Sequence, residues 1–152
     1  MEYKAVRLDD LPRIARDILA LCESTHTHII ALEGDLGSGK TAFVKNIATI
    51  LGVTERVASP TFVIQKIYSV HARGFETMVH IDAYRIEHED EMKTIGWDAI
   101  IANQKNLILI EWPERLLGLI PPNTIHVVFK WIDETTRAIG VFVKDHTHEH
   151  KI

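Results

Sequence analysis

Apolar residues recur at helical spacing in two stretches of the first third of the chain. Each stretch follows the i, i+3, i+4, i+7 rule of a helix with one apolar stripe. The first stretch comprises Leu11, Ile14, Ala15, Ile18, Leu19 and Cys22, and the second comprises Phe43, Val44, Ile47, Ile50 and Leu51. Asp9 or Asp10 can cap the first helix, and Gly52 stands where the second would end. A third helix is predicted over residues 87–103, which begin with acidic side chains, with a break near Gly96.

Other stretches have the composition of strands. Residues 28–33 and 107–110 are almost uniformly apolar, which is typical of parallel strands buried on both faces. Residues 3–8 can form an edge strand. Two hairpins are predicted, the first from 62–70 and 75–82 around a turn at 71–74, and the second from 124–132 and 137–144 around 133–136. We therefore expect an α/β three-layer fold of the P-loop NTPase kind, in which a mixed sheet has a parallel core, antiparallel extensions and helices on both faces.

Length and composition indicate one globular domain. The chain has 152 residues, 46% of them hydrophobic and 25% charged, which fits a single domain over 1–152 and excludes extended disorder. No stretch is long enough to span a membrane, and no signal peptide precedes the first strand, so we expect a cytoplasmic protein. The single Cys22 excludes an internal disulfide.

The net charge of the chain indicates whether it can bind nucleic acid directly. The formal net charge of −4 argues against direct, sequence-independent binding of RNA, so we expect any link to RNA to run through a partner.

His146, His148 and His150 alternate at the C-terminus and could bind a transition metal from one side of an extended segment. We expect instead a mobile tail over about 145–152, because such a tract is only compositional evidence.

The strongest chemical signal is the run from Gly34 to Thr41, which fits the phosphate-binding pattern G-x-x-x-x-G-K-[ST] between a predicted strand and a predicted helix. Glycines there allow backbone N–H groups to approach phosphate oxygens at the positive end of the helix dipole. Lys40 would reach the β- and γ-phosphates, and the Thr41 hydroxyl would ligate Mg²⁺. The nucleotide contacts that we expect in and beside this loop are Asp35, Leu36, Gly37, Ser38, Gly39, Lys40, Thr41 and Ala42.

Two acidic residues at strand ends are candidates for the metal and the catalytic water. Asp82 and Glu111 each follow an apolar strand, and a carboxylate in that position can hold Mg²⁺ directly or through water. Either could instead mark a strand end in solvent, and the sequence does not decide which of the two touches the metal. Thr61 lies in a loop where a hydroxyl could sense the γ-phosphate, although it could equally be a threonine that begins a strand.

The expected nucleotide is ATP. No Asn/Thr-Lys-x-Asp element for guanine is present, which favours ATP over GTP. The eight arginines are scattered singly, with no lid-like insertion, which weakens the case for a small-molecule kinase.

Four short motifs together resemble the bacterial TsaE (YjeE) family. They are the glycine loop, Ser59-Pro60-Thr61-Phe62, His80-Ile81-Asp82-Ala83-Tyr84-Arg85 and Glu111-Trp112-Pro113-Glu114. The resemblance implies an ATPase needed for the threonylcarbamoylation of adenosine 37 in tRNAs that read codons beginning with A. It also implies that ATP hydrolysis resets the TsaD–TsaB pair, which performs the transfer.

Site roles follow from this resemblance by position. Lys40, Asp82, Glu111 and Thr61 become catalytic, Thr41, Glu111 and Asp82 become metal residues, and Trp112 would lie close to the nucleotide. Trp112 could also be a core aromatic residue, and His80 is expected to pack beside Asp82. Ala42, Ile81 and Ala83 depart from the commoner family residues, but none of them removes a required chemical group.

Three hypotheses about function follow. The first is a partner-dependent ATPase of tRNA modification. The second is a nucleotide-gated binding subunit in which ATP orders the Thr61 loop and hydrolysis is incidental. The third, ranked below both, is a small-molecule kinase.

Overall fold

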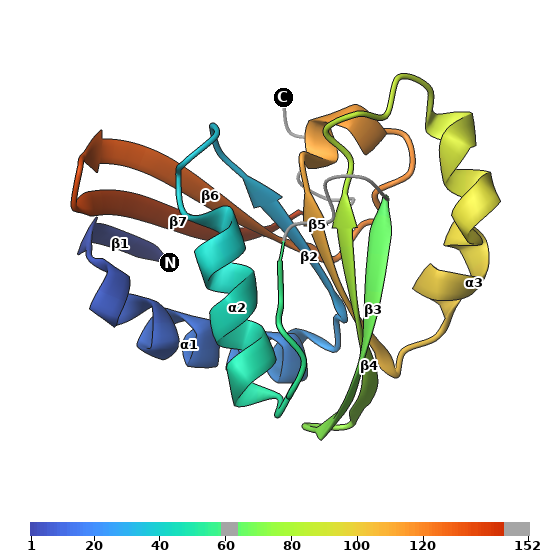
Figure 1. The fold of residues 1–152 in the computed structure, drawn as a ribbon, viewed down its shortest axis with the longest axis horizontal. Helices are drawn as coiled ribbons and strands as arrows, with labels where there is room; N and C mark the ends of the chain where they lie inside the picture. Colours follow the sequence, from blue (N-terminus) through green and yellow to red (C-terminus); the bar gives the residue numbers. More distant parts are fainter. Residues whose placement is uncertain (59–63, 145–152) are drawn as a thin grey trace.

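The computed structural model describes residues 1–58 and 64–144, and its centre is a seven-stranded sheet (Figure 1). The strands run in the order β1-β7-β6-β2-β5-β4-β3. Their bounds are Glu2–Val6 (β1), Ile29–Glu33 (β2), Gln65–Ala72 (β3), Phe75–Asp82 (β4), Asn106–Glu111 (β5), Thr124–Asp133 (β6) and Thr136–Lys144 (β7).

The sheet has a parallel centre and antiparallel margins. β2 pairs in parallel with both β5 and β6, and β4 pairs in parallel with β5. The β3–β4, β6–β7 and β1–β7 pairs are antiparallel. Both predicted hairpins and the predicted mixed sheet are therefore confirmed, although residues 62 and 63 of the first predicted strand lie outside the described residues. The turn of the first hairpin is tighter than expected: Arg73 and Gly74 both have positive φ, at 55° and 84°, as in a two-residue hairpin turn.

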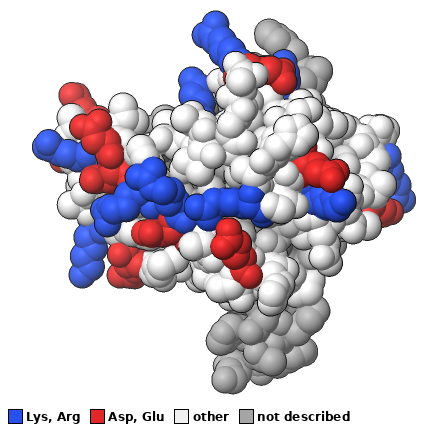
Figure 2. Space-filling view, turned by 90° about the horizontal axis from the view of Figure 1, so that it is seen from below, with Lys and Arg blue, Asp and Glu red and all other residues white. Residues whose placement is uncertain are grey.

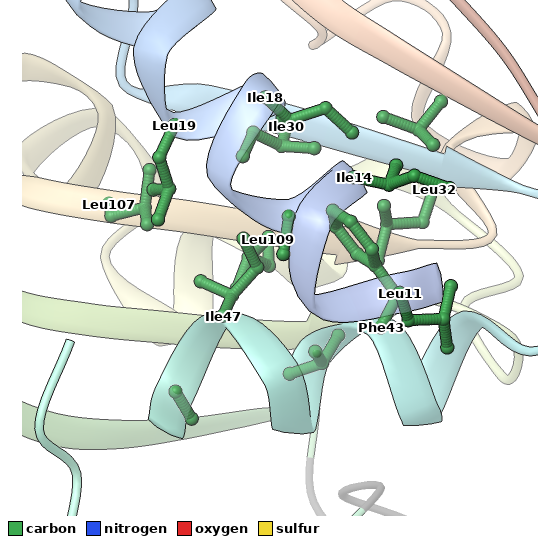
Figure 3. Packing of buried hydrophobic residues seen from close by; sticks show 14 of the residues in the cluster. Leu11, Ile14, Ile18, Leu19, Ile30, Leu32, Phe43, Ile47, Leu107 and Leu109 are labelled. Carbon is green, nitrogen blue, oxygen red and sulfur yellow. The ribbon is translucent and has the colours of Figure 1, made fainter. Parts of the chain in front are cut away.

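Helices cover both faces of the sheet. The α-helices are Leu11–Thr25 (α1), Lys40–Ile50 (α2) and Trp97–Ala102 (α3), and the 3₁₀ turns are Leu8–Asp10 (η1), Glu89–Ile95 (η2) and Pro113–Leu116 (η3). Figure 3 shows α1 and α2 packed on β2 and β5 through buried aliphatic side chains and Phe43. A second apolar cluster places η2 and α3 on the other face, against β4 and β5. The two clusters leave the carboxyl ends of β2, β4 and β5 at one edge, where α2 begins.

Three local expectations need correction. The Asp10 carboxylate accepts the Arg7 backbone N–H at 2.9 Å and makes no capping bond to α1. The first strand ends at Val6, because residues 8–10 form η1. The predicted helix over 87–103 is a 3₁₀ turn followed by the short α3, although the break at Gly96 is confirmed by its φ of 76°.

Two further predictions concern compartment and redox state. No helix in the described ranges, 1–58 and 64–144, is long and apolar enough to cross a membrane. Cys22 lies buried in α1 as a free thiol, and burial raises its pKa to about 12. The interpretation of Cys22 as a buried helix residue is therefore confirmed.

Candidate nucleotide-binding site

The loop between β2 and α2 begins at Gly34, where no other residue fits. Gly34 has a φ of 152°, and an added Cβ would lie 2.6 Å from Ser38 Oγ and 2.9 Å from the Phe129 carbonyl oxygen. Gly37 and Gly39 also have positive φ, at 76° and 109°. The glycine spacing read from the sequence therefore corresponds to backbone geometry that the loop requires.

Arg137 of β7 fixes the outer side of this loop. Its Nη2 donates to the Gly37 carbonyl at 3.0 Å, and its Nε donates to the Ser38 carbonyl at 3.2 Å. Because the C=O and N–H of one trans peptide point in opposite directions, the Gly39 N–H is directed away from Arg137, as phosphate binding would require. Sequence reasoning missed Arg137, because it lies 99 positions after Ser38 and no local pattern marks it.

Lys40 is the first residue of α2 and is 5% exposed. Its Nζ donates to the Gly34 carbonyl oxygen at 2.5 Å and lies 3.7 Å from the centre of the Trp112 ring. Burial lowers the pKa of Lys40, and nearby carboxylates, with Glu111 the largest contributor, partly oppose this. The ammonium group is thus already held over the phosphate loop.

Glu111 lies at the end of β5 and is 3% exposed. Its two carboxylate oxygens face different partners: Oε1 accepts from the Thr41 hydroxyl at 3.5 Å, and Oε2 lies 2.6 Å from His80 Nε2. The sequence did not predict this contact between the His80 ring nitrogen and Glu111. A sequence signal was present, because His80 precedes Asp82 by two positions and so faces the same side of β4.

Asp82 ends β4 directly opposite Glu111 in the parallel pair. Its Oδ1 accepts the Tyr84 backbone N–H at 3.0 Å. Tyr84 in turn packs on Trp112, with ring centres 4.9 Å apart. Trp112 adopts a left-handed backbone conformation, with φ 60°, which turns the chain immediately after Glu111.

The structure thus brings Lys40, Thr41, Asp82, Glu111 and Trp112 together at one edge of the sheet. Asp35 and Leu36 are exposed at the tip of the loop, Ser38 is buried, and Ala42 packs partly against the core. Thr61 lies outside the described residues, as do the C-terminal histidines.

A cavity of about 390 Å³ adjoins the phosphate loop on its β6–β7 side. Its lining includes Ser38 and Gly39 of the loop, Phe129 and Arg137 of the sheet, and Leu8. A volume in this range suits a small organic ligand. The sequence did not predict this cavity, because its walls come from segments far apart in the chain.

The donor set fits a magnesium ion that shares its ligands with phosphate. Among the described residues, no three His, Cys, Asp or Glu side chains form a metal-binding cluster. Mg²⁺ in nucleotide sites uses one or two protein oxygens together with phosphates and water. The Thr41 hydroxyl and the Glu111 carboxylate supply such oxygens at the first turn of α2.

Comparisons with known proteins identify relatives over nearly the whole chain. The family model described as "Threonylcarbamoyl adenosine biosynthesis protein TsaE" matches residues 6–139. The tRNA threonylcarbamoyladenosine biosynthesis protein TsaE of Bacillus subtilis is 33% identical over 139 residues, covering 91% of this chain and 83% of the relative. The protein of the same name from Treponema pallidum is 32% identical over 113 residues, covering 74% and 80%.

A solved structure is similar as well. The crystal structure of Bacillus subtilis YdiB superimposes with a TM-score of 0.70 at 26% identity, covering 98% of this chain and 88% of that chain. The chain is therefore similar in sequence to the two TsaE proteins and in fold to YdiB.

Proposed function

Because the chain belongs to the TsaE family of threonylcarbamoyladenosine biosynthesis proteins, we propose that it supports the threonylcarbamoylation of adenosine 37 in tRNA as a magnesium-dependent ATPase. One observation carries the proposal: Lys40, Thr41 and Glu111 meet at the phosphate loop, with Glu111 3.5 Å from the Thr41 hydroxyl. Hydrolysis would reset the TsaD–TsaB pair between turnovers.

Each residue of the site has a distinct task in this proposal. Backbone N–H groups of the loop and the Lys40 ammonium bind the phosphates. Thr41 and Glu111 would hold Mg²⁺, which when bound neutralises charge on the phosphate oxygens. Asp82, which lies opposite Glu111 in the sheet, would orient water at the same edge. Glu111 is the direct ligand in this proposal, because its Oε1 accepts from the Thr41 hydroxyl.

The cavity beside the loop supports a nucleoside triphosphate as the ligand. It is lined by Ser38 and Gly39 and by residues of β6 and β7, which lie across β2 from the strand β5 that carries Glu111, so a base and ribose there would leave the phosphates over the loop. Apolar surface from Phe129 and Leu8 suits a planar base. We infer that this cavity receives the adenosine part of ATP.

Surface charge favours an indirect link to tRNA. On the face seen in Figure 2, Lys and Arg side chains form a band, with acidic side chains on both sides of it. The net charge is −4. Direct binding of an RNA backbone requires basic side chains that are not neutralised by acidic neighbours. We therefore infer that TsaD–TsaB binds the tRNA and that this chain acts on it only through that pair.

The decisive test replaces Glu111 by Gln, which keeps its shape and removes its charge. Loss of a metal-ligating carboxylate should slow ATP hydrolysis by on the order of 100- to 1,000-fold. Phosphate release would be measured with the protein alone and with purified TsaD–TsaB, and modification of tRNA would be followed over several turnovers. Glu87→Gln, at an exposed position, is the matched control.

The outcomes separate the three hypotheses. Loss of both hydrolysis and repeated modification supports the ATPase. If modification continues at the wild-type rate while hydrolysis is lost, the nucleotide-gated binding subunit replaces it. Label from γ-labelled ATP that appears on an acceptor, instead of in free phosphate, would establish the kinase.

A further inference from the structure

His80 makes the shortest polar contact of the Glu111 carboxylate. The side chain of His80 is fully buried and that of Glu111 is 4% exposed, and the atoms Nε2 and Oε2 lie 2.6 Å apart. An ionised carboxylate can only accept a hydrogen bond, and an imidazole Nε2–H is a donor that suits it at this distance. A short hydrogen bond to a buried carboxylate restricts its rotation strongly.

Sheet geometry places His80 and Glu111 on the same face of the sheet. Sheet pairing sets His80 opposite Leu109 and Asp82 opposite Glu111 on parallel strands. Side chains alternate between the two faces, and Met78 and Leu109 belong to the cluster under α1 and α2, so His80 and Glu111 also face α2. With Oε2 occupied by His80, Oε1 is the oxygen that faces Thr41.

A purely structural role for His80 fits the surroundings poorly. Its Nδ1 is buried without a hydrogen-bond partner in residues 1–58 and 64–144. An apolar side chain of similar size at this position would avoid the cost of burying that nitrogen. What an apolar side chain could not do is donate to Glu111.

We propose that His80 is a positioning residue that holds the Glu111 carboxylate with Oε1 turned toward Thr41, so that the magnesium site is preformed before nucleotide binds. The inference rests on the proposed function. It predicts that His80 acts on the metal through Glu111 and leaves the phosphate loop unaffected. Hydrogen-bonded partners of metal ligands typically change metal affinity by 10- to 100-fold.

The experiment compares His80→Leu, His80→Gln and the double variant His80→Leu/Glu111→Gln with the wild type. Mn²⁺ affinity would be measured from the EPR signal of free Mn²⁺ with protein saturated with a non-hydrolysable ATP analogue. Affinity for the same analogue in EDTA would be measured by calorimetry. His126→Gln is the matched control, because it removes a second buried histidine that contacts a strand-end glutamate.

We expect His80→Leu to weaken Mn²⁺ binding about 10- to 100-fold, with analogue affinity in EDTA changed less than about twofold. His80→Gln should recover part of the loss, because its amide N–H can donate to Glu111. In the Glu111→Gln background His80→Leu should add nothing further, since both changes act on one interaction. Glutamine also serves as the folded variant if leucine destabilises the chain.

Three results would overturn the inference alone: wild-type Mn²⁺ affinity in both His80 variants, equal losses of metal and metal-free analogue binding, or an additive loss in the double variant. Absence of protein-dependent Mn²⁺ binding in the wild type would overturn the proposed function together with it.

Discussion

The chain places a glutamate at the end of each of two parallel strands and pairs each with a histidine, yet the two pairs differ. His80 and Glu111 are separated by 2.6 Å, and their side chains are 0% and 4% exposed. His126 and Glu33 are separated by 3.4 Å, and Glu33 is 32% exposed. His126 also stacks on Phe142, with ring centres 5.1 Å apart.

The faces of the sheet explain the difference. Glu111 shares its face with Leu109, which packs under α1 and α2, so its carboxylate meets Thr41 at the start of α2. Glu33 follows Leu32 of that same cluster by one residue and so faces the opposite side. The same residue types therefore form a candidate metal centre on one face and, on the other, a pair of a buried histidine and a partly exposed glutamate.

The largest effect on the α2 face, apart from Glu111 itself, is expected from Lys40→Ala. The change removes a charge-assisted contact worth about 1.5–3 kcal/mol, which is roughly ten- to a hundredfold in ATP affinity. Calorimetric titration with ATP would measure it, with the exposed Lys45→Ala on the same helix as control. ATP affinity equal to that of the wild type would remove Lys40 from the site.

A smaller effect is expected from Arg137→Ala, which acts from the β6–β7 side on the same loop. The loop loses two hydrogen bonds, to the Gly37 and Ser38 carbonyls, each worth about 1 kcal/mol net. We expect ATP affinity to fall about five- to thirtyfold and thermal unfolding to shift modestly downward.

Arg137→Lys should not restore binding, because an ammonium cannot reproduce the two-point geometry of a guanidinium. The exposed Lys130→Ala on β6 is the control for surface charge. Full affinity in Arg137→Ala would show that the loop holds its shape without support from β7.

The smallest effect is expected from His126→Gln. Its partner Glu33 is about one-third exposed, and such pairs contribute about 0–1 kcal/mol. The free energy of unfolding, measured in urea, should therefore change by less than about 1 kcal/mol, and the rate of ATP hydrolysis should stay at the wild-type value. A loss of hydrolysis comparable to that in Glu111→Gln would mean that the two faces of the sheet are coupled, and would contradict the distinction drawn between the two pairs.

Much of the fold could be predicted from local pattern. The helical stripe from Leu11 to Cys22, the apolar runs that became β2 and β5, and both hairpins depend on neighbours a few positions apart. The 3₁₀ turn η2 was harder, because its apolar positions, such as the buried Met92, suit either helix type. Side-chain packing is not visible in a single sequence.

The sequence by itself determined the phosphate loop, because a glycine at each tight position and the Lys-Thr pair at the helix start are local requirements of one backbone shape. Only the tertiary structure decided what surrounds that loop. His80 reaches Glu111 across 31 positions and Arg137 reaches Ser38 across 99, and such contacts exist only after β4 pairs with β5 and β7 pairs with β6. The alternation of side chains puts His80 and Asp82 on one face of β4, but strand order is set by long-range pairing, so the spacing of residues along the chain does not give the partner of either contact.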